Sequence, residues 1–154
     1  MSITKLQFGG WEFFIDLERT ASYGAAEVEE HCICDDCLNF YRAIDRYYPK
    51  LRPFLAQFGV NVEAPEQMSP IAMDDSRIDY DPSYIVYGRI EKADSLEMVV
   101  ENANVLAQWD GESDYFWLHT YGVSLPWTLD KPFDGAQTPF RKRIANLWGK
   151  LRNT

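Results

Sequence analysis

The sequence predicts an α+β fold, in which an antiparallel sheet is covered by two to three helices within a single domain, 1–154. Three observations support this prediction. Apolar residues alternate with polar ones near the N-terminus, they recur at helical spacing between residues 36 and 58, and β-formers dominate three segments after residue 84. A chain of 154 residues is also long enough to close a hydrophobic core without disulfides or metals.

The chain opens with a predicted β-hairpin. Trp11 to Glu18 alternates apolar with mostly acidic residues, which is typical of a half-buried strand. Ile3 to Phe8 is expected to pair with it, because Gly9-Gly10 supplies the positive φ that a two-residue turn needs. Thr20 to Glu30 holds small and acidic residues without a clear period, and we predict a surface loop there.

Two helices are predicted next. Apolar residues fall at helical spacing from Asp36 onward, and Asp35 or Asp36 is placed to cap the first turn. Pro49 ends this helix, and a shorter one follows with Pro53 near its start and Gly59 as its C-terminal cap. The apolar positions are Cys37, Phe40, Tyr41, Ile44, Tyr47 and Tyr48 in the first helix, then Leu51, Phe54, Leu55 and Phe58 in the second.

The second half of the chain is predicted to be mainly sheet. Val60 to Arg77 contains two prolines and no period, so we expect an irregular crossing with at most a short strand near Ile71. Strands are predicted at Tyr84 to Ile90, Asn104 to Trp109 and Tyr115 to Val123. A hairpin turn at residues 110–113 joins the last two strands.

A last, basic helix is predicted from Thr138-Pro139 onward. Its apolar stripe contains Phe140, Ile144, Leu147, Trp148 and Leu151, and its basic residues are Arg141, Lys142, Arg143, Lys150 and Arg152. We expect the stripe to dock on the sheet of the same domain, with the basic face pairing partly to acidic surface. The alternative is a helix that lies on a membrane or meets an acidic partner.

The composition excludes several classes of function. With 24 acidic and 15 basic residues the formal net charge is −9, which argues against nucleic-acid binding because that affinity rests on Lys and Arg. Neutral or basic partners are favoured instead. The N-terminus lacks the pattern of a secretory signal, and no run approaches the roughly 18 apolar residues of a membrane span. We therefore expect a soluble cytoplasmic protein, and three closely spaced cysteines agree with a reducing compartment.

All three cysteines lie within the run from His31 to Cys37. Cys34 and Cys37 have the two-residue spacing that lets both sulfurs face one ion, so they are candidate zinc ligands. His31 and Cys32 are adjacent and would need a strained backbone to serve the same metal, and His119 would have to be brought near by the fold. The sequence favours a different interpretation over a bound metal, namely that the cysteines are small packing residues and an exposed thiol.

Catalytic interpretations have less support. A redox dithiol at Cys34 and Cys37 is disfavoured, because Asp35 and Asp36 place negative charge beside the sulfurs. The acidic pairs Asp74-Asp75 and Asp79 with Asp81 are typical of solvated loops. The chain has no Gly-rich phosphate loop, GxSxG elbow or HExxH motif, so no residue is assigned a catalytic role.

Two segments carry a resemblance to a protein family. Residues 34–40, Cys-Asp-Asp-Cys-Leu-Asn-Phe, resemble the CxxCxNF signature of a group of small uncharacterised bacterial proteins. Residues 125–130, Leu-Pro-Trp-Thr-Leu-Asp, are similar to the PWxL-acid ending of the same group, and the similarity spans most of residues 11–130. The group has no established activity. The resemblance therefore implies one domain and singles out Cys34 and Cys37, while His31 and Cys32 lie outside its pattern.

Two functions of different classes follow as hypotheses. The first is a non-enzymatic, cytosolic protein-binding module, similar to an immunity protein or antitoxin, whose acidic surface captures a basic partner protein. The second is a metal-dependent or thiol-dependent enzyme that uses Cys34 and Cys37. The aromatic share of 15% is high enough to build a core, a groove or a homodimer face on rings.

Overall fold

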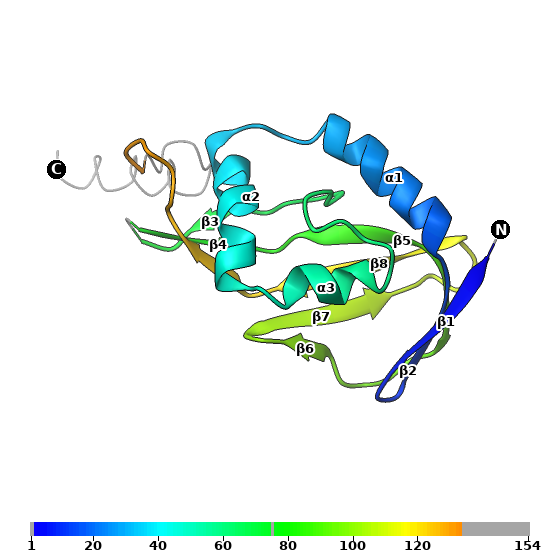
Figure 1. The fold of residues 1–154 in the computed structure, drawn as a ribbon. Coiled ribbons are helices and arrows are strands. Elements are labelled where there is room, and N and C mark those ends of the chain that lie inside the picture. The colour runs from blue at the N-terminus through cyan, green and yellow to red at the C-terminus, as the bar shows by residue number, and fades with distance from the viewer. Residues whose placement is uncertain (1, 75, 134–154) are drawn as a thin grey trace, which may run out of the picture.

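The computed structural model describes residues 2–74 and 76–133. In chain order, the elements in this part are β1 (Ile3–Phe8), β2 (Trp11–Asp16), α1 (Leu17–Glu29), α2 (Asp35–Tyr47), α3 (Leu51–Ala56), β3 (Ile71–Ala72), β4 (Arg77–Tyr80), β5 (Ser83–Lys92), β6 (Met98–Val100), β7 (Ala103–Gln108), β8 (Tyr115–Tyr121) and β9 (Val123–Pro126). They form an α+β domain with antiparallel sheets, as predicted (Figure 1). One sheet has the strand order β1-β2-β5-β8-β7-β6, and the other has the order β3-β4-β9.

The opening hairpin is confirmed. Phe8 pairs with Trp11 across the turn, and Ile3 pairs with Asp16 at the far end. The second strand ends at Asp16, two residues before the predicted end at Glu18. Its buried apolar side chains are Trp11, Phe13 and Ile15, as the alternation indicated.

The predicted surface loop from Thr20 to Glu30 is wrong, because this segment forms most of α1. The Asp16 side chain caps the helix by accepting the Arg19 N–H at 3.0 Å. The buried side of α1 carries the small residues Thr20 and Gly24 and has no apolar stripe. Since Gly24 has no side chain, α1 runs close to the segment around Ala64 without bulky apolar contacts.

The two predicted middle helices are confirmed, but not the cap of the first. The N-cap of α2 is Cys34 and has no side-chain cap hydrogen bond, whereas Asp35 lies in the first turn and pairs with Lys131 at 2.9 Å. The turn after α3 is closed at Gly59, whose φ is +79°. There the Val60 N–H donates to the Leu55 carbonyl at 3.1 Å, which is the Schellman pattern of a glycine cap.

The hydrophobic core lies between the six-stranded sheet and the pair of α2 and α3, which lie over one face of it (Figure 1). Aromatic rings connect the layers. Phe13 of β2 meets Phe58 edge to face at 5.1 Å and stacks on Phe116 of β8 at 5.4 Å. The largest fully buried side chains are Tyr80, Tyr84, Phe13, Phe40, Phe58, Phe116, Ile15, Ile44, Leu51, Leu55, Ile78 and Leu118.

The strands of the second half match their predictions in part. The short strand near Ile71 is present as β3, and the predicted strands from Tyr84 and Asn104 correspond to β5 and β7. The predicted strand from Tyr115 to Val123 is two strands, because the chain leaves the large sheet at Gly122 and continues as β9 in the small one. The strands β4 and β6 have no counterpart among the predictions.

The predicted basic helix from Thr138 onward lies outside the described residues. Among the helices of residues 2–133, none has both the length and the apolar character needed to cross a membrane.

Candidate metal centre

The three cysteines come together at the start of α2. Cys32 and Cys34 lie in the connection from α1, and Cys37 lies in the first turn of α2. Their sulfur atoms all lie within 4.8 Å of one another. Thiolates that share a tetrahedral zinc at about 2.3 Å are roughly 3.8 Å apart, so a shift of about 1 Å or less would close the cluster on an ion.

Tyr41 holds the connection that carries Cys32. The Tyr41 hydroxyl donates to the Cys32 carbonyl at 3.0 Å, and its ring stacks on His31 with a centroid distance of 4.4 Å. Within the cluster, the Cys34 N–H donates to the Cys32 sulfur at 3.5 Å. A helix residue one turn into α2 therefore fixes the backbone of the loop that precedes the helix.

The three thiols differ in their surroundings. Cys32 and Cys34 are exposed, whereas Cys37 is only 5% exposed. Hydrogen bonds from Cys34 lower the pKa of Cys32, while burial raises the pKa of Cys34 and that of Cys37. The thiols of Cys34 and Cys37, the predicted pair, are thus less acidic than the thiol of Cys32. Of the three, Cys32 loses its proton most readily.

A buried carboxyl group lies beside the cluster. Asp36 is 3% exposed, and its Oδ1 has no hydrogen-bond partner among the described residues. Burial, and then the charge of Asp35, raises the pKa of Asp36. The Asp36 charge in turn opposes ionisation of Cys32. A cation at the thiols would offset the repulsion between the Asp36 carboxylate and a Cys32 thiolate.

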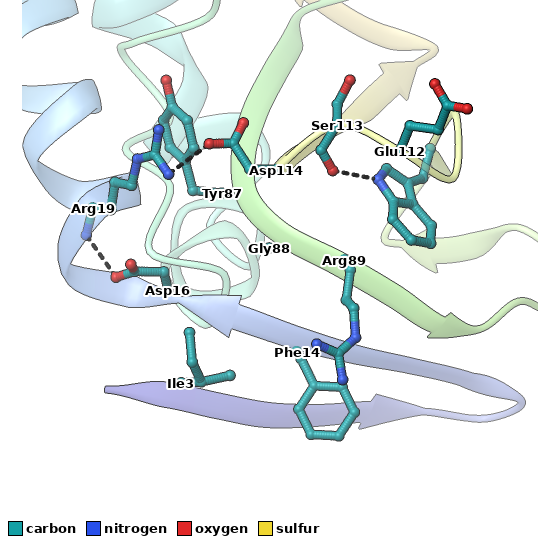
Figure 2. Close-up of a pocket in the computed structure, with 11 residues that line it drawn as sticks. Ile3, Phe14, Asp16, Arg19, Tyr87, Gly88, Arg89, Glu112, Ser113 and Asp114 are labelled. Carbon is teal, nitrogen blue, oxygen red and sulfur yellow. Dashed lines mark hydrogen bonds and ion pairs between the residues drawn. The ribbon is translucent and has the colours of Figure 1, made fainter. Parts of the chain in front are cut away.

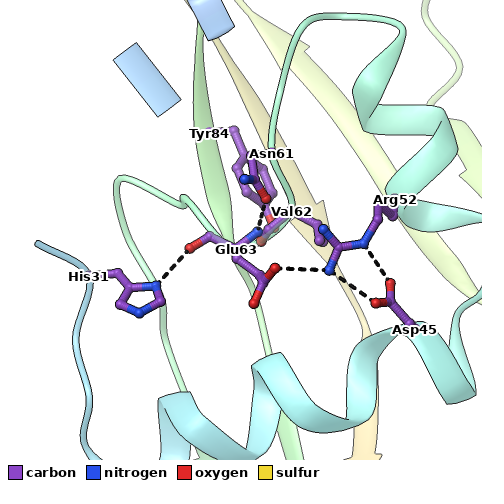
Figure 3. Close-up of polar contacts among 7 residues, drawn as sticks. All are labelled: His31, Asp45, Arg52, Asn61, Val62, Glu63 and Tyr84. Carbon is purple, nitrogen blue, oxygen red and sulfur yellow. Dashed lines mark hydrogen bonds and ion pairs between the residues drawn. The ribbon is translucent and has the colours of Figure 1, made fainter. Parts of the chain in front are cut away.

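His31 lies outside the group of sulfurs and faces the segment that follows α3 (Figure 3). Its Nδ1 lies 3.4 Å from the Glu63 carbonyl oxygen. The Glu63 carboxylate is held by Arg52 at 3.1 Å, and Arg52 also pairs with Asp45 at 2.8 Å. Of the adjacent residues His31 and Cys32, only the cysteine turns toward the other sulfurs, as expected for neighbours in an unstrained backbone.

His119 also lies outside the group of sulfurs. It is on β8, where its Nδ1 lies 2.9 Å from the Ser83 hydroxyl and its Nε2 lies 2.9 Å from the Gln108 side-chain oxygen. Because that oxygen only accepts, Nε2 carries the proton and Nδ1 accepts from Ser83. Burial against these neighbours lowers the pKa of His119.

Of the acidic residues considered for catalysis, Asp74 and Asp81 cap turns, and Asp79 lies within β4. The Asp74 carboxylate accepts the N–H groups of Ser76 and Arg77, at 2.8 and 3.0 Å. Asp81 accepts the Gly122 N–H at 3.2 Å, next to the turn between β8 and β9. Asp75 lies outside the described residues.

Comparison of the chain with protein-family models, with curated proteins and with solved structures found no match. The site is therefore defined by its own geometry. Sequence reasoning found the cysteines through their spacing, but it took Tyr41 only as an apolar position of a helix. The spacing of Tyr41 in the sequence contains no signal for its contact with the Cys32 carbonyl, because that contact depends on how the loop turns back along α2.

Proposed function

We propose that the protein binds one thiophilic metal ion, zinc being the best fit, through the thiolates of Cys32, Cys34 and Cys37. The observation that supports this proposal is the approach of all three sulfurs to within 4.8 Å. Thiolate ligands select soft or borderline ions such as zinc and copper(I) over magnesium or calcium. A single domain with its own hydrophobic core does not need the ion in order to fold, so the metal has a local role.

The position of the cluster at the start of a helix partly offsets the burial that raises the pKa of Cys34 and of Cys37. The N-terminus of α2 presents backbone N–H groups and the positive end of the helix dipole to the cluster, and both stabilise thiolates. Binding a dication would displace the thiol protons and relieve the repulsion among Cys32, Asp35 and Asp36. We therefore expect metal affinity to rise with pH, because each thiol must lose a proton to become a ligand.

Three protein ligands would leave the fourth tetrahedral position for water or for a group from another molecule. Cys32 and Cys34 are exposed, so this position would be within reach of solvent. A metal-dependent enzyme, the alternative function, would use the same position.

The test is metal analysis of protein purified without chelator or affinity tag, together with a cobalt(II) titration. We expect about one zinc per chain, and a thiolate-to-cobalt charge-transfer band whose intensity corresponds to three sulfurs. The variants Cys32→Ser, Cys34→Ser and Cys37→Ser should each weaken the band and the affinity. His119→Ala is the matched control and should change neither.

Two results would contradict the proposal. One is wild-type protein that contains no metal and gives no thiolate band with cobalt(II). The other is metal binding that survives when all three cysteines are replaced by serine, since the ion would then be held elsewhere on the chain.

A further inference from the structure

The face of the six-stranded sheet turned away from the core carries Tyr87 of β5 and Tyr115 and Trp117 of β8, and Tyr23 of α1 and Trp109, just after β7, extend this row of rings. We name it the aromatic groove and define it by Tyr23, Tyr87, Trp109, Tyr115 and Trp117. Three hollows of about 360, 230 and 260 Å³ run along it. The first two share Tyr87, the first and third share Trp109, and the last two share Tyr115 and Trp117, so the hollows form one groove.

The hollows of the groove differ in the charged residues that line them. The two smaller hollows, on either side of Trp117 and Tyr115, are lined by a single charged residue each: Glu66 in one and Asp110 in the other. The Tyr23 hydroxyl donates to the Glu66 carboxylate and holds it at the groove. This part of the groove is therefore aromatic and negatively charged, a combination that attracts cations.

The largest hollow of the groove is lined by two arginine side chains of the chain itself. The Arg19 guanidinium lies 3.9 Å from the centroid of the Tyr87 ring and forms an ion pair with Asp114 at 2.7 Å (Figure 2). The Arg89 guanidinium lies 4.6 Å from the centroid of the Phe14 ring. At two places, then, the chain seats one of its own guanidinium groups on a ring of this face.

The rings of Tyr115 and Trp117, which line both smaller hollows, carry no such group from within residues 2–133. Each smaller hollow combines these ring faces with a carboxylate, as Tyr87 and Asp114 do around Arg19. We propose that the aromatic groove binds arginine side chains of a basic partner polypeptide, with guanidinium groups on Trp117 and Tyr115 and charges paired to Glu66 and Asp110. This site is separate from the cysteine cluster and does not depend on metal binding.

Arginine fits the groove better than other ligands do. Its planar guanidinium stacks on rings and also pairs with carboxylates, whereas the lysine ammonium is a compact, strongly hydrated charge. The hollows beside Trp117, at 230 and 260 Å³, are smaller than the roughly 300–1,000 Å³ of sites for whole small molecules, and they suit single side chains. Nucleic acids would meet the repulsion of Glu66 and Asp110.

The test is an NMR titration of the full chain, with and without zinc, using the peptide Gly-Arg-Gly-Arg-Gly acetylated and amidated at its ends. We expect the indole N–H signals of Trp117 and Trp109 to shift, with tighter binding than for peptides in which lysine or citrulline replaces arginine. Because this readout uses the unmodified protein, it does not depend on any variant folding. If the peptide binds equally well with and without zinc, the groove is a site independent of the metal centre.

Matched variants locate the binding. Trp117→Ala and Tyr115→Ala should each weaken arginine-peptide binding about 3- to 30-fold, whereas Tyr47→Ala, which removes an exposed ring on α2, should not. Glu66→Gln should weaken binding more than Glu97→Gln, which removes the same charge from an exposed position outside the groove. The thermal unfolding of each variant is measured first, to establish that the variant has the native fold.

Four results would overturn the proposal. Equal losses in Glu66→Gln and Glu97→Gln, or equal binding of arginine and lysine peptides, would mean general attraction to an acidic protein. Unchanged indole signals would remove the groove as the site. Shifts produced by the neutral sugar oligomer maltohexaose, in the absence of any with the arginine peptide, would make the groove a carbohydrate site instead.

Discussion

Asn39 and Thr128 are joined by two hydrogen bonds although 89 positions separate them in the chain. The Asn39 side-chain oxygen accepts the Thr128 N–H at 2.7 Å and the Thr128 hydroxyl at 2.9 Å. Its amide nitrogen donates to the Pro126 carbonyl at 3.1 Å and to the Tyr80 hydroxyl at 3.3 Å. These contacts connect residues 34–40 with residues 125–130, so the asparagine and proline of the two motif-like segments hold α2 against the end of β9.

We expect Asn39→Ala to lower the free energy of unfolding by about 3 kcal/mol, because it removes four hydrogen bonds of a fully buried side chain and leaves the Thr128 N–H and the Pro126 carbonyl without their Asn39 partner. Urea unfolding measures the change. Asn104→Ala, at an exposed position of β7, is the matched control and should change stability by less than about 0.5 kcal/mol. Similar small losses in both variants would show that the Asn39 contacts contribute little.

A second close approach lies between β2 and β5. Gly88 has a φ of +150°, and a Cβ atom there would lie 2.1 Å from the Phe14 carbonyl oxygen. We expect Gly88→Ala to lower the free energy of unfolding by more than about 3 kcal/mol, because the two strands must separate to admit the methyl group. Circular dichroism during chemical unfolding gives the value.

Gly111→Ala is the control for the backbone conformation alone. Gly111 has a φ of +84° and no atom within 4 Å of the added Cβ, so we expect a loss of about 1–2 kcal/mol. If both alanine variants lost the same stability, the contact with Phe14 would not explain the need for glycine at position 88.

The parts of the fold that the sequence predicted are those with a strong local pattern. The alternation of Trp11, Phe13 and Ile15 specified β2, and the helical spacing that includes Phe40 and Ile44 specified α2, because each buries one face. The helix α1 was missed because it buries Thr20 and Gly24 instead of an apolar stripe. The sequence features that favour this helix are a side-chain cap and alanines with high helix propensity. Neither of them contributes to a hydrophobic period.

The candidate site was predicted in the same uneven way. The spacing of Cys34 and Cys37 in the sequence is enough to nominate them, since residues three apart share a face at a helix start. The participation of Cys32 instead of His31 depends on the loop held by Tyr41, and the aromatic groove depends on strands separated by some thirty residues. Contacts of this kind have no local pattern, so the sequence alone does not show them.

The cap of α1 leads to a further prediction. Asp16→Ala removes the acceptor of the Arg19 N–H, and we expect it to lower the free energy of unfolding by about 1 kcal/mol. Asp16→Asn keeps a side-chain oxygen and should lose less. Glu18→Ala, in the same first turn but exposed, should change stability by about 0.5 kcal/mol or less. Equal losses for all three variants would indicate an effect of charge at the helix start instead of a cap.

The lowered pKa of His119 predicts a pH dependence of stability. Burial keeps the ring neutral in the folded protein, so the unfolded chain binds a proton at a pH where the folded chain does not. The stability contributed by neutral His119 is therefore complete above its ordinary pKa of 6.5 and is lost as the pH falls through the folded value. NMR titration should give a midpoint below 6.5. His119→Gln should flatten the fall in stability over this range, and an unchanged slope would contradict the assignment.

Tyr41→Phe separates the role of the Tyr41 hydroxyl from that of its ring. The phenylalanine keeps the stack on His31 but loses the hydrogen bond to the Cys32 carbonyl, so the loop is less restrained before a metal arrives. Groups that orient metal ligands typically contribute about 10- to 100-fold to affinity, and we expect a loss near the lower end because the backbone, not the sulfur, is released. Competition with a chelator of known affinity measures it.

The control for this variant is Tyr47→Phe, which removes a hydroxyl from an exposed ring of the same helix and should leave metal affinity unchanged. Thermal unfolding of the two variants without metal should differ little, since Tyr41 donates its hydrogen bond at an exposed site. A loss of affinity with unchanged apo stability therefore assigns Tyr41 to positioning of the cluster. Unchanged affinity would mean that the hydrogen bond from the Cys34 N–H to the Cys32 sulfur is enough to hold the cluster in place.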